Sequence, residues 1–171
     1  MSPNDVITLP TRSGIELEVR PAKESDEADL TAFFERVADE DRRFRFFAAA
    51  DKVSAQQIAP LVNADQFRTE SWIGFDKASG QMVSSGVLAC DAALDTAEVA
   101  ISVASVYKGK GIGWAMLDFL GKQAEARGCR KVMSIESREN SAAIEVERDK
   151  GFTPESFPGD PTLVVLSKTF R

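Results

Sequence analysis

The sequence contains no histidine, and this single absence excludes several kinds of catalytic site. Serine and cysteine nucleophiles that depend on a histidine base are ruled out, and so is every metal site with histidine ligands. The side chains that remain for acid–base chemistry are aspartate, glutamate, lysine, cysteine and one tyrosine, Tyr107. We therefore expect no metal cofactor.

Cysteine is almost as scarce, since the chain has only Cys90 and Cys129. These residues are far apart in the chain and do not have the spacing of a zinc site or of a redox-active pair. Two thiols do not make a disulfide framework, so the composition favours a reducing, cytoplasmic environment. A covalent acyl-cysteine route would need a group to activate a thiol. Because no histidine is present and apolar neighbours raise a thiol pKa, we favour a structural role for both.

Long apolar runs and an excess of positive charge are also missing. The first ten residues lack the basic segment and the apolar run of a signal peptide. No stretch approaches the roughly 20 apolar residues of a membrane span, so we expect no membrane partner. The 21 lysines and arginines are outnumbered by 27 aspartates and glutamates, which gives a net charge of −6. This balance argues against nucleic-acid binding and suits a cationic partner.

What the sequence does contain is an ordinary globular composition, 43% hydrophobic and 28% charged, over 171 residues. That length is enough for a sizeable hydrophobic core and is typical of one domain. No internal repeat and no linker rich in proline, glycine or serine divides the chain. We therefore expect a single domain over residues 1–171.

The hydrophobic pattern changes period along the chain. Residues 15–20 (IELEVR) alternate apolar and charged side chains, as in a half-buried strand. A helix should follow, with Ser25 as its candidate N-cap. Further helices are expected at about 54–63, 114–127 and 141–150, and further strands at 71–76, 81–90, 96–103, 131–136 and 162–168. Three antiparallel strands followed by alternating strands and helices predict an α/β (α+β) fold.

The most informative segment is the glycine-rich turn at 107–113 (YKGKGIG), between an expected strand and an expected helix. Glycines let the backbone approach an anion closely, and the free N–H groups of a helix N-terminus attract negative charge. We call residues 108–113 the cradle, because this pattern is typical of a phosphate site. The alternative is a tight turn with no ligand. A Walker A loop and a dinucleotide fingerprint do not fit, because Trp114 and Met116 stand where those motifs need other residues.

The cradle resembles the acyl-CoA-binding motif of the GNAT acyltransferases, here Lys108-x-x-Gly111-x-Gly113. A second segment, Asn140-Ser141-Ala142-Ala143 followed by Gly151-Phe152, is similar to another signature of that family. The resemblance implies a mixed, mostly antiparallel sheet of six to seven strands, flanked by about four helices and splayed near Val103. It also implies acetyl-CoA as cosubstrate. The residues it assigns to cofactor binding are Ile101, Val103, Lys108, Gly109, Lys110, Gly111, Ile112, Gly113 and Asn140.

Two further segments resemble the GNAT domain of Pat-type protein lysine acetyltransferases. One is Arg45-Phe46-Phe47, at the end of a charged stretch, and the other is Ala97-Glu98-Val99-Ala100, whose glutamate the resemblance assigns as general base. On a strand, Glu98 would lie on the opposite face from Ala97 and Val99, among small residues that leave room for a substrate. The structural alternative is a solvent-exposed strand glutamate.

The resemblance implies acetyl transfer to an amine, by direct transfer in a ternary complex and with a protein lysine as preferred acceptor. A small-molecule amine acetyltransferase and a non-catalytic acyl-CoA sensor remain as alternatives. Many family members protonate the leaving thiolate with a tyrosine seven residues after the asparagine, where this sequence has Glu147. We assign no general acid from the sequence, and the resemblance leaves open whether the chain forms a homodimer.

Overall fold

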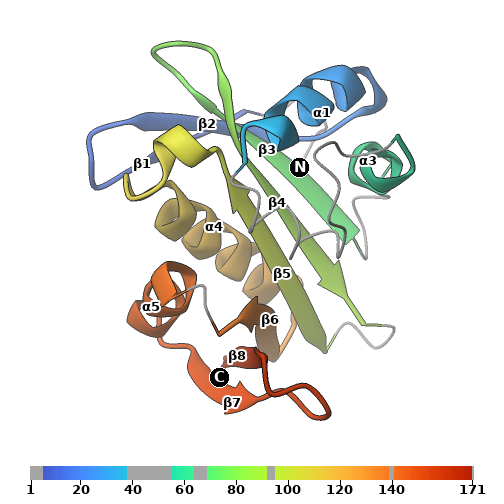
Figure 1. Cartoon of the computed structure of the whole chain (residues 1–171), viewed down its shortest axis with the longest axis vertical. Coiled ribbons are helices and arrows are strands. Elements are labelled where there is room, and N and C mark those ends of the chain that lie inside the picture. The colour runs from blue at the N-terminus through green and yellow to red at the C-terminus, as the bar shows by residue number, and fades with distance from the viewer. Residues whose placement is uncertain (1–5, 38–54, 64–68, 92–94, 139–140, 171) are drawn as a thin grey trace.

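An eight-stranded sheet forms the centre of the computed structural model, which describes residues 6–37, 55–63, 69–91, 95–138 and 141–170 (Figure 1). The strands are β1 (Ile7–Pro10), β2 (Glu16–Pro21), β3 (Thr69–Asp76), β4 (Met82–Cys90), β5 (Thr96–Val103), β6 (Lys131–Ser137), β7 (Thr153–Ser156) and β8 (Leu163–Thr169). Their order is β1-β2-β3-β4-β5-β6-β8-β7. Every neighbouring pair is antiparallel except β5 and β6, which run parallel.

Helices cover both faces of the sheet, because alternate residues of the strands are apolar on both sides. On β3, Trp72 packs in one hydrophobic cluster with the helix α4 (Ile112–Ala126). The next residue, Ile73, packs in a second cluster with α1 (Glu27–Glu35) and α3 (Ala55–Val62). The helix α5 (Ser141–Asp149) adds Ile144 and Val146 to the α4 side.

The predicted fold class is confirmed, but the sheet has eight strands and not six to seven. The two strands that the sequence pattern missed are the edge strands. β7 is short, contains Pro154 and is exposed at all four positions, so no apolar alternation marks it. β1 covers only four residues and is defined by its pairing with β2, where Leu9 lies opposite Leu17.

The parallel contact between β5 and β6 is much shorter than either strand. It pairs only Thr96 with Lys131, Ala97 with Val132 and Glu98 with Met133. Beyond that last pair, which we call the divergence point, the two strands separate. The splay predicted near Val103 therefore begins earlier, directly after Glu98. The segment that links β5 to β6 includes α4, which packs against the sheet beside the opening.

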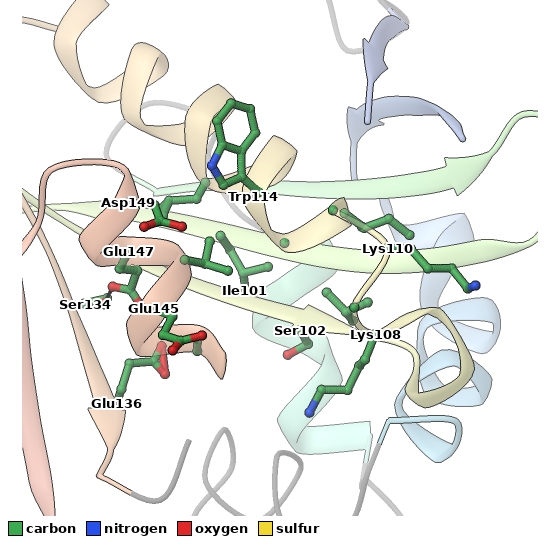
Figure 2. A pocket seen from close by; sticks show the side chains of 18 of the residues that line it. Ile101, Ser102, Lys108, Lys110, Trp114, Ser134, Glu136, Glu145, Glu147 and Asp149 are labelled. Atoms are coloured by element: carbon green, nitrogen blue, oxygen red, sulfur yellow. Dashed lines mark hydrogen bonds between the residues drawn. The ribbon is translucent and has the colours of Figure 1, made fainter. Parts of the chain in front are cut away.

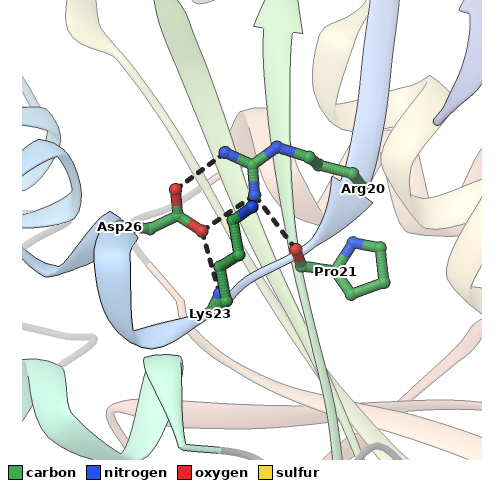
Figure 3. A network of polar contacts seen from close by, with 4 residues as sticks. All are labelled: Arg20, Pro21, Lys23 and Asp26. Atoms are coloured by element: carbon green, nitrogen blue, oxygen red, sulfur yellow. Dashed lines mark hydrogen bonds and ion pairs between the residues drawn. The ribbon is translucent and has the colours of Figure 1, made fainter. Parts of the chain in front are cut away.

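The end of β2 is tied to the first helical turn by a network around Asp26 (Figure 3). The Arg20 guanidinium donates Nη1 and Nη2 to the two carboxylate oxygens of Asp26 at 2.8 and 2.7 Å, and the backbone N–H of Lys23 donates to the same carboxylate at 2.9 Å. Asp26 therefore satisfies the backbone at the start of this turn, and the prediction that Ser25 is the cap is wrong. Burial alone would raise the pKa of Asp26, but these hydrogen bonds lower it below its ordinary value.

This network predicts a stability loss that depends on pH. The substitution Asp26→Asn should lower the free energy of unfolding by about 1–3 kcal/mol at pH 7, because it removes a charged partner from a bidentate pair. Because the pKa of Asp26 is depressed in the folded state, the advantage of the wild type should be constant above the ordinary aspartate pKa of about 3.9. It should shrink as the pH falls below that value. Urea unfolding across this range measures both effects.

The matched control is Asp29→Asn, on an exposed side chain of the same segment. It should change stability far less at every pH. Equal losses in the two variants would show that the Arg20–Asp26 pair contributes nothing specific.

Candidate functional site

The cradle joins the end of β5 to α4 and presents backbone N–H groups to one side. A short 3-10 turn, Ser105–Tyr107, follows β5, and Gly109 and Gly111 then have φ angles of +78° and +84°. Only glycine adopts such angles without strain. Gly111 is the N-cap of α4, which begins at Ile112, two residues earlier than the pattern predicted. The first N–H groups of α4 have no partner within the helix, so they are available to an anion.

One cavity of about 560 Å³ extends from the cradle along the opening between β5 and β6. Eight of the predicted binding residues line it, namely Ile101, Val103, Lys108, Gly109, Lys110, Gly111, Ile112 and Gly113. Asn140 lies outside the described residues, as does the segment 38–54 that contains Arg45, Phe46 and Phe47. Segments from β5, the cradle, α4, β6 and α5 thus meet around a single space.

The remaining predicted residue, Glu98, is exposed on β5 and does not line the cavity. Its neighbours Ala97 and Val99 are buried in the cluster that contains α4, so the Glu98 side chain extends from the opposite face of the sheet. It also belongs to the last paired residues before β5 and β6 separate. Glu98 therefore stands at the closed end of the opening, on the face that α1 and α3 cover.

Sequence reasoning missed a contribution from the hairpin between β1 and β2. Arg12 and Ser13, in the turn of that hairpin, line the cavity. A Cβ atom placed on Gly111 would be 3.1 Å from the backbone nitrogen of Arg12, so the hairpin lies directly against the cradle. No local pattern could reveal this contact, because it joins residues about a hundred positions apart.

The aromatic ring of Trp114 lies in the first turn of α4, at the rim of the cavity, between two cations. The Arg12 guanidinium carbon is 4.8 Å from the ring centroid and the Lys150 Nζ is 3.8 Å from it. Lys150 also forms an ion pair of 2.6 Å with Asp118. Within the part of the chain that the structure describes, Arg12 has no such ion pair, so its charge is available to an anion near the cradle.

The opposite wall of the cavity is acidic. Figure 2 shows four carboxylates gathered on the side away from Lys108 and Lys110. We call these residues the acidic wall: Glu136, Glu145, Glu147 and Asp149. Glu136 belongs to β6 and the other three belong to α5. The wall and the cradle give the two ends of the cavity opposite charge.

Glu147 differs from the other members of the acidic wall in its burial. Only 5% of the residue is exposed, and its carboxyl accepts a hydrogen bond from the Ser134 hydroxyl on β6. It also shares a side-chain hydrogen bond with Glu136. Burial raises the pKa of Glu147 above its ordinary value, and this effect exceeds the opposite effect of the two hydrogen bonds. Sequence reasoning noted this residue but gave it no role.

The two cysteines lie in the core and do not line the cavity. Their sulfur atoms are 3.8 Å apart. Burial, together with Cys90, raises the pKa of Cys129 to about 11, so this thiol is almost entirely protonated at neutral pH. The geometry gives no support to an acyl-cysteine route.

No group of three or more metal-ligating side chains occurs within residues 6–37, 55–63, 69–91, 95–138 and 141–170. Over the same ranges, no helix is both long enough and apolar enough to cross a membrane.

Comparison with known proteins gave a family match and several similar structures. The model of the acetyltransferase (GNAT) family matches residues 16–152, a span that includes the cradle and all of the acidic wall. An acetyltransferase of Pseudomonas aeruginosa is 24% identical over 149 residues, which are 86% of this chain and 80% of that protein.

Among solved structures, the GNAT domain of S. lividans PAT superposes with a TM-score of 0.86 at 25% identity, covering 96% of this chain and 97% of that one. The yncA structure from Salmonella typhimurium, determined with its cofactor acetyl-CoA, superposes with a TM-score of 0.68 at 17% identity. That alignment covers 91% of this chain and 94% of the other.

The contact between Gly111 and the hairpin predicts a difference between two glycines of the cradle. Alanine at either Gly109 or Gly111 must adopt a positive φ, which destabilises the fold by about 1–2 kcal/mol. Only at position 111 does the new Cβ also press against backbone, because nothing lies within 4 Å of the Cβ position at Gly109. Urea unfolding should therefore show a larger loss for Gly111→Ala than for Gly109→Ala. Equal losses would mean that the hairpin moves away at no cost.

Proposed function

This chain belongs to the acetyltransferase (GNAT) family, and from that premise we propose that it transfers an acetyl group from acetyl-CoA to the side-chain amine of a protein lysine. The observation that carries the proposal is the cavity. It extends from an anion-binding cradle along the opening between two central strands, and Glu98 stands where those strands separate, on the opposite face of the sheet. A direct transfer in a ternary complex needs both features.

The cradle supplies what the phosphates of acetyl-CoA require. Its glycines and the first turn of α4 present N–H groups, and Lys108, Lys110 and Arg12 add positive charge beside them. The rest of the cosubstrate is a narrow, flexible chain ending in the thioester, which the opening between β5 and β6 would accept. Asn140, outside the described residues, remains a predicted contact for that chain.

The backbone of β5 offers donors for the thioester carbonyl. From Val99 to Val103, β5 pairs with β4 but no longer with β6, so its groups that face the opening have no partner in that strand. An N–H near Val103 would stabilise the negative oxygen that forms when the amine attacks.

Glu98 is the proposed general base. A lysine amine has an ordinary pKa of about 10.4, so only about one molecule in a few thousand is unprotonated at pH 7. A carboxylate at the divergence point can attract the ammonium group and accept its proton, directly or through water. Because Glu98 extends from the face opposite the acidic wall, the acceptor would approach from the α1 and α3 side.

The lysine acceptor is the finer part of the proposal. It is supported by the Ala97-Glu98-Val99-Ala100 segment and by the similarity to the GNAT domain of S. lividans PAT. The alternatives are a small-molecule amine and a sensor without turnover. Incubation of a cell lysate with the protein and labelled acetyl-CoA distinguishes them, since label on protein lysines supports the first and label only on small amines the second. Binding without transfer to any amine would favour the sensor.

Binding of acetyl-CoA can be tested at Gly113, the second glycine of the motif. This position has room for a Cβ, whose nearest neighbour would be Val103 at 3.9 Å, and it lines the cavity. In calorimetric titrations, Gly113→Trp should abolish binding by filling the cavity, whereas Gly113→Ala should bind nearly as well as the wild type. A folded wild type that does not bind acetyl-CoA would refute the proposed function.

The role of Glu98 predicts a separation of binding from turnover. Glu98→Gln should keep the affinity for acetyl-CoA but lower kcat by about 100-fold or more, because an amide cannot accept the amine proton. CoA thiol release with a lysine peptide as acceptor measures the rate. Glu18→Gln, at a half-buried position of β2 opposite Phe75 of β3, is the control and should leave kcat unchanged. Unchanged kcat in Glu98→Gln would remove the base assignment.

A further inference from the structure

Acetyl transfer leaves the sulfur of CoA as a thiolate, which becomes a stable product only when it gains a proton. If the chain has the proposed function, on which this inference rests, a side chain must supply that proton. The sulfur must lie near the divergence point, because the amine that attacks the thioester is deprotonated there by Glu98. A donor must therefore be found at the closed end of the opening and on the cavity side of the sheet.

On β6, Ser134 lies at the closed end of the opening. It directly follows Met133, the last β6 residue paired with β5, so it is the first residue of β6 beyond the divergence point. Its side chain is buried, and its hydroxyl donates a hydrogen bond to Glu147 on α5. The Glu147 carboxyl is thus held against β6 at the closed end of the cavity, where Figure 2 shows it next to Ser134.

Several other proton donors that line the cavity are placed less well. Tyr107 donates its hydroxyl hydrogen to Asp76 at 3.0 Å, on β3. Lys108 and Lys110 belong to the cradle, on the side of the cavity away from Glu147. The Ser134 hydroxyl already donates its hydrogen bond to Glu147. Serine hydroxyls are in any case very weak acids compared with a carboxyl group.

We propose that Glu147 is the catalytic acid of this acetyltransferase, donating its carboxyl proton to the thioester sulfur. The amine nitrogen forms a bond to the carbonyl carbon, and its surplus proton passes to Glu98 or to water. The C–S bond then breaks, its electron pair stays on sulfur, and the Glu147 proton completes the CoA thiol. The Glu147 carboxylate regains a proton from solvent, for which Glu136 provides a neighbouring carboxyl on the same wall.

The surroundings of Glu147 favour its protonated form. Burial raises its pKa, and the charged groups nearest to it in the cavity are the carboxylates Glu136 from β6 and Glu145 and Asp149 from α5 itself. The cavity walls from β5 and α4 contribute no charged side chain. Charged groups described on α4 and β8 include Asp118, which pairs with Lys150, and Lys168, which lies against Gly151. A carboxyl group whose pKa is raised toward neutrality is suited to donate a proton near pH 7.

Glu98 and Glu147 would then act from opposite faces of the sheet. Glu98 is exposed on the side of α1 and α3, whereas Glu147 is buried where α5 meets Ser134 of β6. The thioester, between β5 and β6, would lie between the proposed base on one face and the proposed acid on the other. This separation keeps the two carboxyl groups from exchanging their roles.

The test compares wild type with Glu147→Gln, which keeps a hydrogen-bond acceptor for Ser134 but has no acidic proton. Release of the CoA thiol from acetyl-CoA is measured with spermidine and with a lysine peptide, from about pH 5.5 to pH 9. The ratio of wild-type to variant kcat cancels the ionisation of the amine. It should be about 10- to 100-fold at the acidic end. Because the pKa of Glu147 is raised, the ratio should fall as the pH increases and this carboxyl loses its proton.

Glu145→Gln is the matched control, since it removes one carboxylate from the same wall and the same helix. Its ratio to wild type should not vary with pH. The acid assignment would be overturned if the ratio of wild-type to Glu147→Gln kcat did not change with pH, or if this variant were as fast as the wild type. This holds even if the variant changed the affinity for acetyl-CoA or the urea midpoint. Failure of the wild type to bind acetyl-CoA or release thiol would instead overturn the proposed function, so the two failures are distinguishable.

Discussion

The parallel contact between β5 and β6 ends after three residue pairs, and the candidate site depends on that early end. A sheet that stops pairing at its centre leaves backbone N–H and C=O groups facing an open space, and buried groups of this kind need partners. In this chain the space is a cavity of about 560 Å³, closed by α4 on one side and by α5 on another. The cradle lines the cavity because it follows β5 after one short 3-10 turn. Glu98 stands where the opening between β5 and β6 begins, because it belongs to the last residue pair.

In this chain without histidine, the proposed acid and the proposed base are both carboxyl groups, and the fold gives them two contrasting environments. Glu98 is exposed, whereas Glu147 is buried with two hydrogen-bonding partners. Burial raises the pKa of Glu147 above its ordinary value, which favours the protonated form on that side of the strand opening. Placement on opposite faces of the sheet follows from the alternation of side chains along β5 and from the packing of α5 over β6.

Sequence patterns predicted the fold class, the central strands and the cradle because each depends on local rules. Alternation marks β5, and glycines that must adopt positive φ mark the turn before α4. The edge strand β7 was missed because proline and exposed polar residues carry no strand signal, and its existence depends on β8. Arg12 and Ser134 were missed for a related reason. Their place at the cavity depends on which distant segments pack together, and no local pattern in a single sequence encodes that.

The contact between the β1–β2 hairpin and Gly111 links the first strand of the chain to its motif. β1 is the outermost strand on its side of the sheet, four strands away from β5 in the sheet order, yet the turn after it lies against the cradle. The proposed acetyl-CoA site therefore includes a contact from the β1–β2 hairpin. We expect expression tags, truncations or natural variation before residue 15 to alter the affinity for acetyl-CoA, even where every residue of the cradle is unchanged.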